Sequence, residues 1–371
     1  MILRKYLVER GDMPKTVLVN GCFLLQQISG VQRYASELLS ALVRIRQDRY
    51  NWLLAVPGRR RQLVQEIGGM DVYFDNSVLH PAIWTQASFP LLGGRLGADF
   101  LWSPANIGPL LHSKPQVITV FDGSLYHNRK WFDWKFSAYY KTVFAGYKYS
   151  ANRIITCSDF SKGEIVKYLC VPPAKVDVVP AAISSSFCRV NEKSVLDGRY
   201  VLSLGSRDPR KNIRSVIRAW RRVPADIKNG LRLVIAGGGN TNFAVESLGR
   251  ATDDVVFLGY VPDKDLPALY SNAHCFVYPS FYEGFGLPPL EAMACGCPVI
   301  TSDVASLPEV CGDAAYYVDP YSIDSIVHGF REVVRNEQLR GRLVENGFEN
   351  GKRFNWDRSA AEMLRALDKI N

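Results

Sequence analysis

Short apolar, β-branched segments alternate with segments of helical periodicity along most of this chain, and this pattern constrains the fold more than any other feature. Such alternation indicates βα units that build parallel sheets. Strands are predicted at 16–20, 52–56, 100–102, 117–120, 153–156 and 176–179, and in a second series at 200–204, 231–236, 255–258, 275–278, 298–301 and 316–318. Helices are predicted at 31–46, 138–149, 161–169, 212–222, 265–270 and 287–294, and then from about residue 320 to the C-terminus.

A stretch of small residues after Pro180 separates the two series and predicts a linker between two domains. The length of 371 residues also exceeds the size at which one hydrophobic core normally suffices. We therefore predict an α/β protein with two Rossmann-like domains at 1–182 and 183–352, followed by a helical segment at 353–371. Ligands of such folds bind at the carboxyl ends of the strands, so the cleft between the domains is the expected site.

The basic residues are unevenly distributed. The net charge is +9, and residues 1–180 hold 22 Lys and Arg against 13 Asp and Glu, whereas residues 181–371 hold 23 of each. The excess suggests that the N-terminal half faces nucleic acid, a phosphorylated substrate or a membrane surface. No apolar run has the length of a bilayer span and no signal-peptide pattern opens the chain, so a cytoplasmic location with reduced cysteines is expected.

Two glutamates flank a glycine-rich turn between a predicted strand and a predicted helix. Glu283 would lie in the loop and Glu291 one turn into the helix, so both carboxylates could bind sugar hydroxyls in one cleft. The glycines of the segment 284–287 would let the backbone approach a ligand, and the prolines that follow suit the first turn of a helix. An ordinary βα turn with a capping and a solvated glutamate is the alternative.

A second turn is basic. Gly205 ends a predicted strand, and Arg207 and Lys211 precede the next helix. An arginine and a lysine beside a helix N-terminus can clamp a diphosphate, whereas a solvated basic turn is the alternative. In the first half, Gly30 lies at a loop-to-helix junction, where a glycine either admits a phosphate or sugar or simply starts the helix.

Asp122 follows a predicted strand of the first half, where its carboxylate could contact a substrate, and His127 could orient an acceptor hydroxyl. A capping aspartate and a surface histidine are the alternatives. The pair Asp263 and Asp265 has the spacing of an Asp-x-Asp metal site but fits a helix cap better. Motifs of serine hydrolases, zincins, P-loop proteins and dinucleotide-binding proteins are missing, so no metal or cofactor is expected.

Together, these motifs resemble those of the family 4 glycosyltransferases, retaining enzymes of the GT-B fold that use nucleotide sugars. The resemblance runs from about residue 20 to the C-terminus, and the spacing of Glu283 and Glu291 is its most specific part. The run Gly-Val-Gln-Arg-Tyr at 30–34 is similar to that of O-antigen and lipopolysaccharide mannosyltransferases. The resemblance implies an acceptor-binding N-terminal domain, a donor-binding C-terminal domain and a C-terminal helix that crosses back to the N-terminal domain.

The resemblance also implies roles for individual residues. Arg207 and Lys211 would hold the diphosphate and stabilise it as leaving group, Glu291 would bind the ribose, and Glu283 the transferred sugar. Asp122, Arg207, Lys211 and Glu283 would thus be catalytic. The expected donor contacts are Gly30, Gly205, Arg207, Lys211, Glu283, Gly284, Phe285, Gly286, Leu287 and Glu291. Many members carry a histidine at the position of Phe121, and whether His127 compensates for its absence is open.

A metal-independent transfer of mannose or a related hexose from a GDP-sugar is implied, with a UDP-sugar as the alternative. The implied acceptor is a lipid-linked saccharide of bacterial surface polysaccharide synthesis. The basic half would then dock peripherally on an anionic membrane rather than on nucleic acid, and a merely solubilising surface is the alternative. The expected acceptor and membrane contacts are Tyr126, His127, Arg44, Arg46, Arg59, Arg60 and Arg61. A non-catalytic basic protein that binds nucleotides or nucleic acid is the rival class, and a phosphorylase or an epimerase is the rival within the fold.

Overall fold

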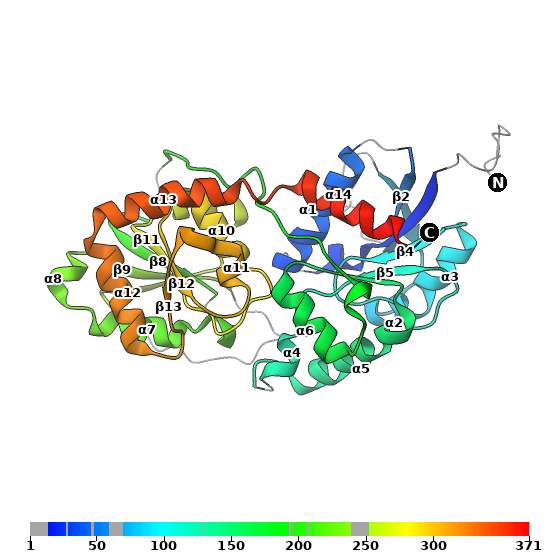
Figure 1. Cartoon of the computed structure of the whole chain (residues 1–371), viewed down its shortest axis with the longest axis horizontal. Helices are drawn as coiled ribbons and strands as arrows, with labels where there is room; N and C mark the ends of the chain where they lie inside the picture. The colour runs from blue at the N-terminus through cyan, green and yellow to red at the C-terminus, as the bar shows by residue number, and fades with distance from the viewer. Residues whose placement is uncertain are drawn as a thin grey trace.

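The computed structural model describes residues 14–26, 29–45, 48–58, 70–128, 130–192, 194, 196–205, 208–238 and 252–370. Within these residues, each half of the chain forms one parallel sheet with helices on both faces (Figure 1). The fold prediction of two Rossmann-like domains is confirmed. The exact boundaries at 182 and 352 stay predictions.

The N-terminal sheet has the strand order β3-β2-β1-β4-β5-β6-β7, and every neighbouring pair is parallel. The strands β4 and β5 are buried along their whole length, as expected for a sheet covered by helices on both faces. The strands are β1 (Lys15–Asn20), β2 (Tyr50–Pro57), β3 (Asp71–Asp75), β4 (Phe100–Ser103), β5 (Gln116–Thr119), β6 (Arg153–Thr156) and β7 (Val176–Val178). The helices are η1 (Gly21–Leu25), α1 (Gly30–Arg44), α2 (Pro81–Gln86), α3 (Ser88–Arg95), α4 (Ser124–His127), α5 (Trp134–Ser150), α6 (Asp159–Leu169) and η3 (Pro173–Lys175).

The C-terminal sheet has the order β10-β9-β8-β11-β12-β13 and is also parallel. Its strands are β8 (Tyr200–Leu204), β9 (Arg232–Ala236), β10 (Val255–Gly259), β11 (Cys275–Tyr278), β12 (Val299–Ser302) and β13 (Ala315–Val318). The helices are η4 (Pro209–Lys211), α7 (Ile213–Arg222), α8 (Ala225–Lys228), η5 (Asp263–Asp265), α9 (Leu266–Ser271), α10 (Leu287–Ala294), α11 (Leu307–Cys311), η6 (Gly312–Ala314), α12 (Ile323–Arg335), α13 (Glu337–Gly351) and α14 (Trp356–Asp368).

The last helix, α14, crosses back to the N-terminal half and lies along α1 (Figure 1). The Trp356 ring packs edge-on against the Tyr34 ring at 5.7 Å between centroids. At the far end of α14, Asp368 accepts a hydrogen bond from the Tyr50 hydroxyl at 2.8 Å. The predicted crossing of the C-terminal helix is therefore confirmed.

Two other properties concern the whole chain. All eight cysteines are free, and five of them are buried. No helix in the described ranges combines the length and the apolar character that crossing a bilayer requires.

Candidate functional site

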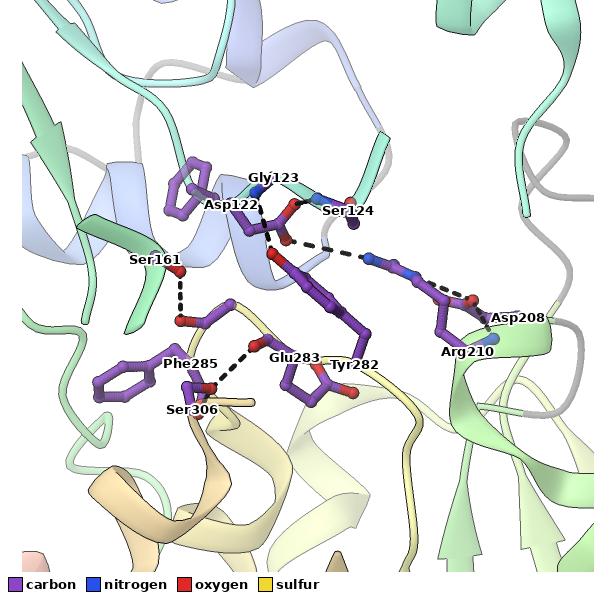
Figure 2. Close-up of polar contacts among 12 residues, drawn as sticks. Asp122, Gly123, Ser124, Ser161, Asp208, Arg210, Tyr282, Glu283, Phe285 and Ser306 are labelled. Carbon is purple, nitrogen blue, oxygen red and sulfur yellow. Dashed lines mark hydrogen bonds and ion pairs between the residues drawn. The ribbon is translucent and has the colours of Figure 1, made fainter. Parts of the chain in front are cut away.

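Three loops from the carboxyl ends of strands meet between the two sheets (Figure 2). One follows β5 in the N-terminal half and carries Asp122, and the other two follow β8 and β11 in the C-terminal half and carry Lys211 and Glu283. In an open α/β sheet, the carboxyl ends of the strands are where ligands bind. The loops therefore meet between the two sheets, at the place where the sequence predicts a ligand cleft.

Lys211 and Glu283 form a partly buried ion pair, with 2.5 Å between Nζ and Oε1. The position of Lys211 depends on Gly205, which has φ of +101° and whose added Cβ would lie 2.5 Å from Lys211 Cγ. The ammonium group also lies 5.0 Å from the centre of the Tyr278 ring. This geometry holds the Lys211 side chain at the end of β8, where an anionic ligand can exchange for the carboxylate.

The Gly284 carbonyl docks into the N-terminal half. It accepts hydrogen bonds from the hydroxyls of Ser158 and Ser161 at 2.6 and 2.8 Å, at the first turn of α6. A Cβ on Gly284 would lie 2.8 Å from Cβ of Asp122, so only glycine allows this approach. In the C-terminal half, the Ser306 hydroxyl lies within hydrogen-bond distance of the backbone oxygens on both sides of Gly284 (Figure 2).

The rest of the loop shapes the start of α10. Gly286 has φ of +111° and directly precedes the helix, which begins at Leu287 with two prolines in its first turn. The neighbouring Phe285 ring is buried and packs edge-on against the Phe354 ring. The backbone amides at the start of α10 are thereby presented at the cleft end of the helix.

Asp122 is oriented from both halves of the molecule. Its Oδ1 accepts a hydrogen bond from the Ser124 amide at 2.8 Å, and its Oδ2 lies 3.9 Å from the Arg210 guanidinium (Figure 2). Gly123, rather than Asp122, occupies the N-cap position of α4. Arg210 in turn contacts Asp208, with 2.7 Å between Nη2 and Oδ2. Although burial raises the pKa of Asp208, Arg210 and Lys211 outweigh it, so the pKa is lowered and the carboxylate stays charged.

Glu291 is almost completely buried, and both of its oxygens have partners. Arg33 from α1 donates to Oε1, and the Tyr270 hydroxyl lies 3.3 Å from Oε2. Burial raises the pKa of Glu291, and the two partners offset only part of this effect. Although burial lowers the pKa of the Arg33 guanidinium, Glu291 and Asp263 outweigh it, so the pKa is raised.

The short helix α4 carries the two predicted acceptor residues. The Tyr126 ring stacks on the Tyr168 ring, and His127 pairs with Glu164 and lies 4.6 Å from the Tyr282 ring centre. Phe121 instead packs against Tyr34, so its side chain takes part in the apolar contacts beside α1.

Some predicted residues are not placed here. Arg207, Arg46, Arg59, Arg60 and Arg61 lie outside the described residues. As the helix-cap prediction expects, Asp265 occupies the N-cap position of α9, although its side chain makes no capping hydrogen bond. Asp263 pairs with Arg33 at 2.7 Å. The solvated-glutamate alternative is wrong, since Glu291 is buried.

Sequence reasoning assigned no role to four residues that shape the site. Arg33, Asp208, Arg210 and Tyr282 connect its parts; the Tyr282 hydroxyl accepts a hydrogen bond from the Gly123 amide at 3.0 Å. Arg210 could have been suspected from its place beside Lys211. Arg33 could not, because its partners Asp263 and Glu291 lie more than 200 positions away in the sequence.

Two Rossmann-like sheets with a cleft between them and a C-terminal helix that crosses back define the GT-B class of fold. The chain superposes on sucrose-phosphate synthase from Thermosynechococcus elongatus with a TM-score of 0.72, over 96% of this chain and 99% of that one. At 18% identity, this similarity concerns the fold alone.

The sequence assigns the family. The profile of Glycosyltransferase Family 4 matches residues 28–187, and that of glycosyl transferases group 1 matches residues 187–350. Together the two profiles span residues 28–350, and the chain belongs to the family 4 glycosyltransferases. It is 37% identical to O-antigen chain mannosyltransferase B of Escherichia coli, over 58% of this chain and 60% of that protein. It is 34% identical to O-antigen chain mannosyltransferase RfbU of Salmonella typhimurium, over 57% of this chain and 58% of that protein. The matched segments thus span less than two thirds of either relative.

Proposed function

We propose that this protein is a retaining hexosyltransferase that takes a nucleotide sugar, GDP-mannose or a related GDP-hexose, into the cleft between its two halves. The Lys211–Glu283 pair carries the proposal, because a side chain that can hold a diphosphate and a carboxylate that can hold sugar hydroxyls lie together at the carboxyl ends of β8 and β11. The family assignment and the mannosyltransferase relatives support the reaction class and the choice of mannose.

In the proposed reaction, the acceptor hydroxyl attacks the anomeric carbon from the face that the diphosphate leaves. The bond from the anomeric carbon to the diphosphate oxygen breaks, the bond to the acceptor oxygen forms, and the acceptor proton passes to the departing phosphate. Lys211, together with Arg207, stabilises the charge on the diphosphate without a metal ion. Glu283 and the backbone amides at the start of α10 hold the sugar, and Asp122 faces it from the N-terminal half.

The experiment that tests this function is the Lys211→Ala variant. Loss of the ammonium removes one electrostatic contact to the leaving group, so we expect the turnover number to fall about 100-fold. The measurement is release of GDP from GDP-mannose in the presence of a polyprenyl-diphosphate-linked oligosaccharide. Lys352→Ala, at an exposed lysine that pairs with Glu349 on the surface, is the matched control. A near wild-type rate in Lys211→Ala would contradict the assignment.

The base of the donor is tested separately. Melting temperatures with GDP, UDP, GDP-mannose and UDP-glucose at equal concentrations rank the affinities, because a ligand that binds only the folded state stabilises it. We expect the largest shift with the guanine nucleotides. A larger rise in melting temperature with UDP than with GDP would show that the donor is a UDP-sugar, and the proposed reaction class would be unaffected.

The acceptor belongs to the N-terminal half in this proposal. A pocket of about 380 Å³ opens there between η1, α2 and α5, and is lined by Asn20, Gln26, His80, Thr85, Tyr139 and Tyr140, among others. Polar groups interspersed with aromatic rings suit a saccharide. Because α5 forms one wall of this pocket, a lipid-linked acceptor would place its lipid near that helix.

The exposed face of α5 suits an anionic membrane. Trp134 and Tyr149 are 71% and 85% exposed, and the helix contains three lysines and no Asp or Glu. Aromatic rings and lysines on one helix are typical of interfacial segments at membranes. We therefore propose peripheral docking through α5 at the cytoplasmic face of the membrane. Arg44 is a weaker candidate than the sequence suggested, because it pairs with Asp357.

A further inference from the structure

The Arg33 side chain reaches from the N-terminal half into the donor side of the cleft. Helix α1 begins against α10, since a Cβ on Gly30 would lie 3.8 Å from the Leu287 side chain. Arg33 is in the first turn of α1 and therefore faces Glu291, one turn into α10. One guanidinium nitrogen bonds Glu291 and another lies 2.7 Å from Asp263.

This contact closes Glu291 to any ligand. The Glu291 side chain is only 4% exposed, and its two oxygens are taken by Arg33 and by the Tyr270 hydroxyl. The guanidinium is also held over the Phe187 ring, 5.3 Å from its centre. A ribose hydroxyl can reach the carboxylate only if Arg33 moves.

Asp263 offers the guanidinium a second position. Its side chain is 44% exposed, so an ion pair there loses less hydration than the pair with buried Glu291. A pocket of about 270 Å³ adjoins this pair and is lined by Gln32, Arg33, Ser184, Phe187 and Asp263, among others. The guanidinium therefore has both a partner and space when it leaves Glu291.

We infer that Arg33 competes with the ribose of the nucleotide for Glu291 and thereby sets the donor affinity, with Asp263 holding the displaced guanidinium. The inference rests on the proposed function, because it takes Glu291 as the ribose contact. When only a fraction of the molecules has the site open, the apparent affinity is reduced by that fraction. Donor binding is thus coupled to the contact between α1 and α10.

Two substitutions should act in opposite directions. Arg33→Met keeps the apolar stem and removes the competitor, so the affinity for GDP should rise about fivefold or more, at the lower end of typical coupling between sites. Asp263→Asn leaves Arg33 with Glu291 as its only charged partner among those described, so the affinity for GDP should fall by a similar factor. When Asp263→Asn is added to Arg33→Met, it should have no further effect on the affinity for GDP, because the guanidinium that Asp263 would hold is gone.

The measurement is isothermal titration of each full-length variant with GDP and with 2′,3′-dideoxy-GDP, with folding checked by circular dichroism. The gain in Arg33→Met should be confined to GDP, whose ribose carries the hydroxyls. Arg49→Met, which breaks an exposed pair with Asp368, is the control and should bind GDP as the wild type does.

The outcomes separate the two proposals. Weaker or unchanged GDP binding by Arg33→Met, or tighter binding by Asp263→Asn, would overturn the competition while the proposed function stands. A wild-type protein that binds neither GDP nor UDP would overturn both. Simple loss of a positive charge weakens the binding of an anion, so a gain in Arg33→Met cannot come from that cause.

Discussion

At Gly284, a single residue joins the two halves of the molecule through its backbone. Its carbonyl accepts from Ser158 and Ser161 at the start of α6, while the adjoining Glu283 side chain contacts Lys211 in the C-terminal half. The contact requires a bare Cα, because the nearest atoms to an added Cβ include the Phe121 carbonyl oxygen at 2.9 Å. The Phe121 carbonyl oxygen belongs to the backbone, so it cannot move aside as the end of a flexible side chain can.

Gly284→Ala should therefore destabilise the closed cleft. We expect a loss of about 1–3 kcal/mol in the free energy of unfolding, as overpacking typically costs, and a drop of at least tenfold in kcat/KM as the two halves separate. Gly341→Ala in α13 is the control, because nothing lies within 4 Å of its added Cβ. Urea unfolding and the GDP-release assay measure the two effects. Full stability and activity in Gly284→Ala would show that the interface can shift without cost.

Among the helices and strands, those with a clear local sequence signal were predictable and those that depend on tertiary packing were not. The strand at 200–204 and the helix at 287–294 have the predicted bounds. By contrast, β3 is a short edge strand with acidic residues at both ends and no fully buried position. Helix α3 contains a proline and two glycines, and Gly93 packs so closely that its added Cβ would lie 2.7 Å from the Leu101 side chain. The local sequences of β3 and α3 therefore carry no pattern that predicts a strand or a helix.

The site divides in the same way. The turns that carry Glu283, Glu291 and Lys211 were predictable, because glycines and prolines at fixed spacing mark them. The partners were not, because Arg33 reaches Glu291 and Arg210 reaches Asp122 only when the two halves meet. Spacing in a sequence reports local turns, whereas a contact between domains depends on the whole topology.

Helix α14 is the element that ties the last residues of the chain to the first domain, and Trp356 is its largest buried side chain. Its exposed fraction is 7%, and its ring packs against Tyr34. Trp356→Ala should lower the free energy of unfolding by about 3–5 kcal/mol, because a large aromatic leaves a cavity. Leu111→Ala, at a residue that is 84% exposed, should change it by about 0.5 kcal/mol or less. Urea titration measures both, and equal effects would contradict the packing argument.

At the scale of the whole molecule, the excess charge and the proposed donor contacts lie in different halves. The excess of +9 belongs entirely to residues 1–180, while Lys211, Glu283 and Glu291 lie in the half whose charges balance. Binding of a donor diphosphate therefore does not account for the excess. The described surface that best matches an anionic partner is α5, where the lysines lie beside exposed aromatic rings.

The docking proposal predicts binding to vesicles of phosphatidylethanolamine and phosphatidylglycerol at low salt, and weaker binding as salt screens the charges. Each lysine near an anionic surface contributes about 1 kcal/mol. Lys135→Glu with Lys148→Glu should therefore lower the partition coefficient at least tenfold, and Trp134→Ala with Tyr149→Ala should lower it through lost apolar contact. The control is Tyr321→Ala, at an equally exposed aromatic residue of the C-terminal half. Vesicle sedimentation measures all four proteins. If the wild type fails to sediment, or the α5 variants sediment as it does, the basic half serves another purpose than membrane docking through this helix.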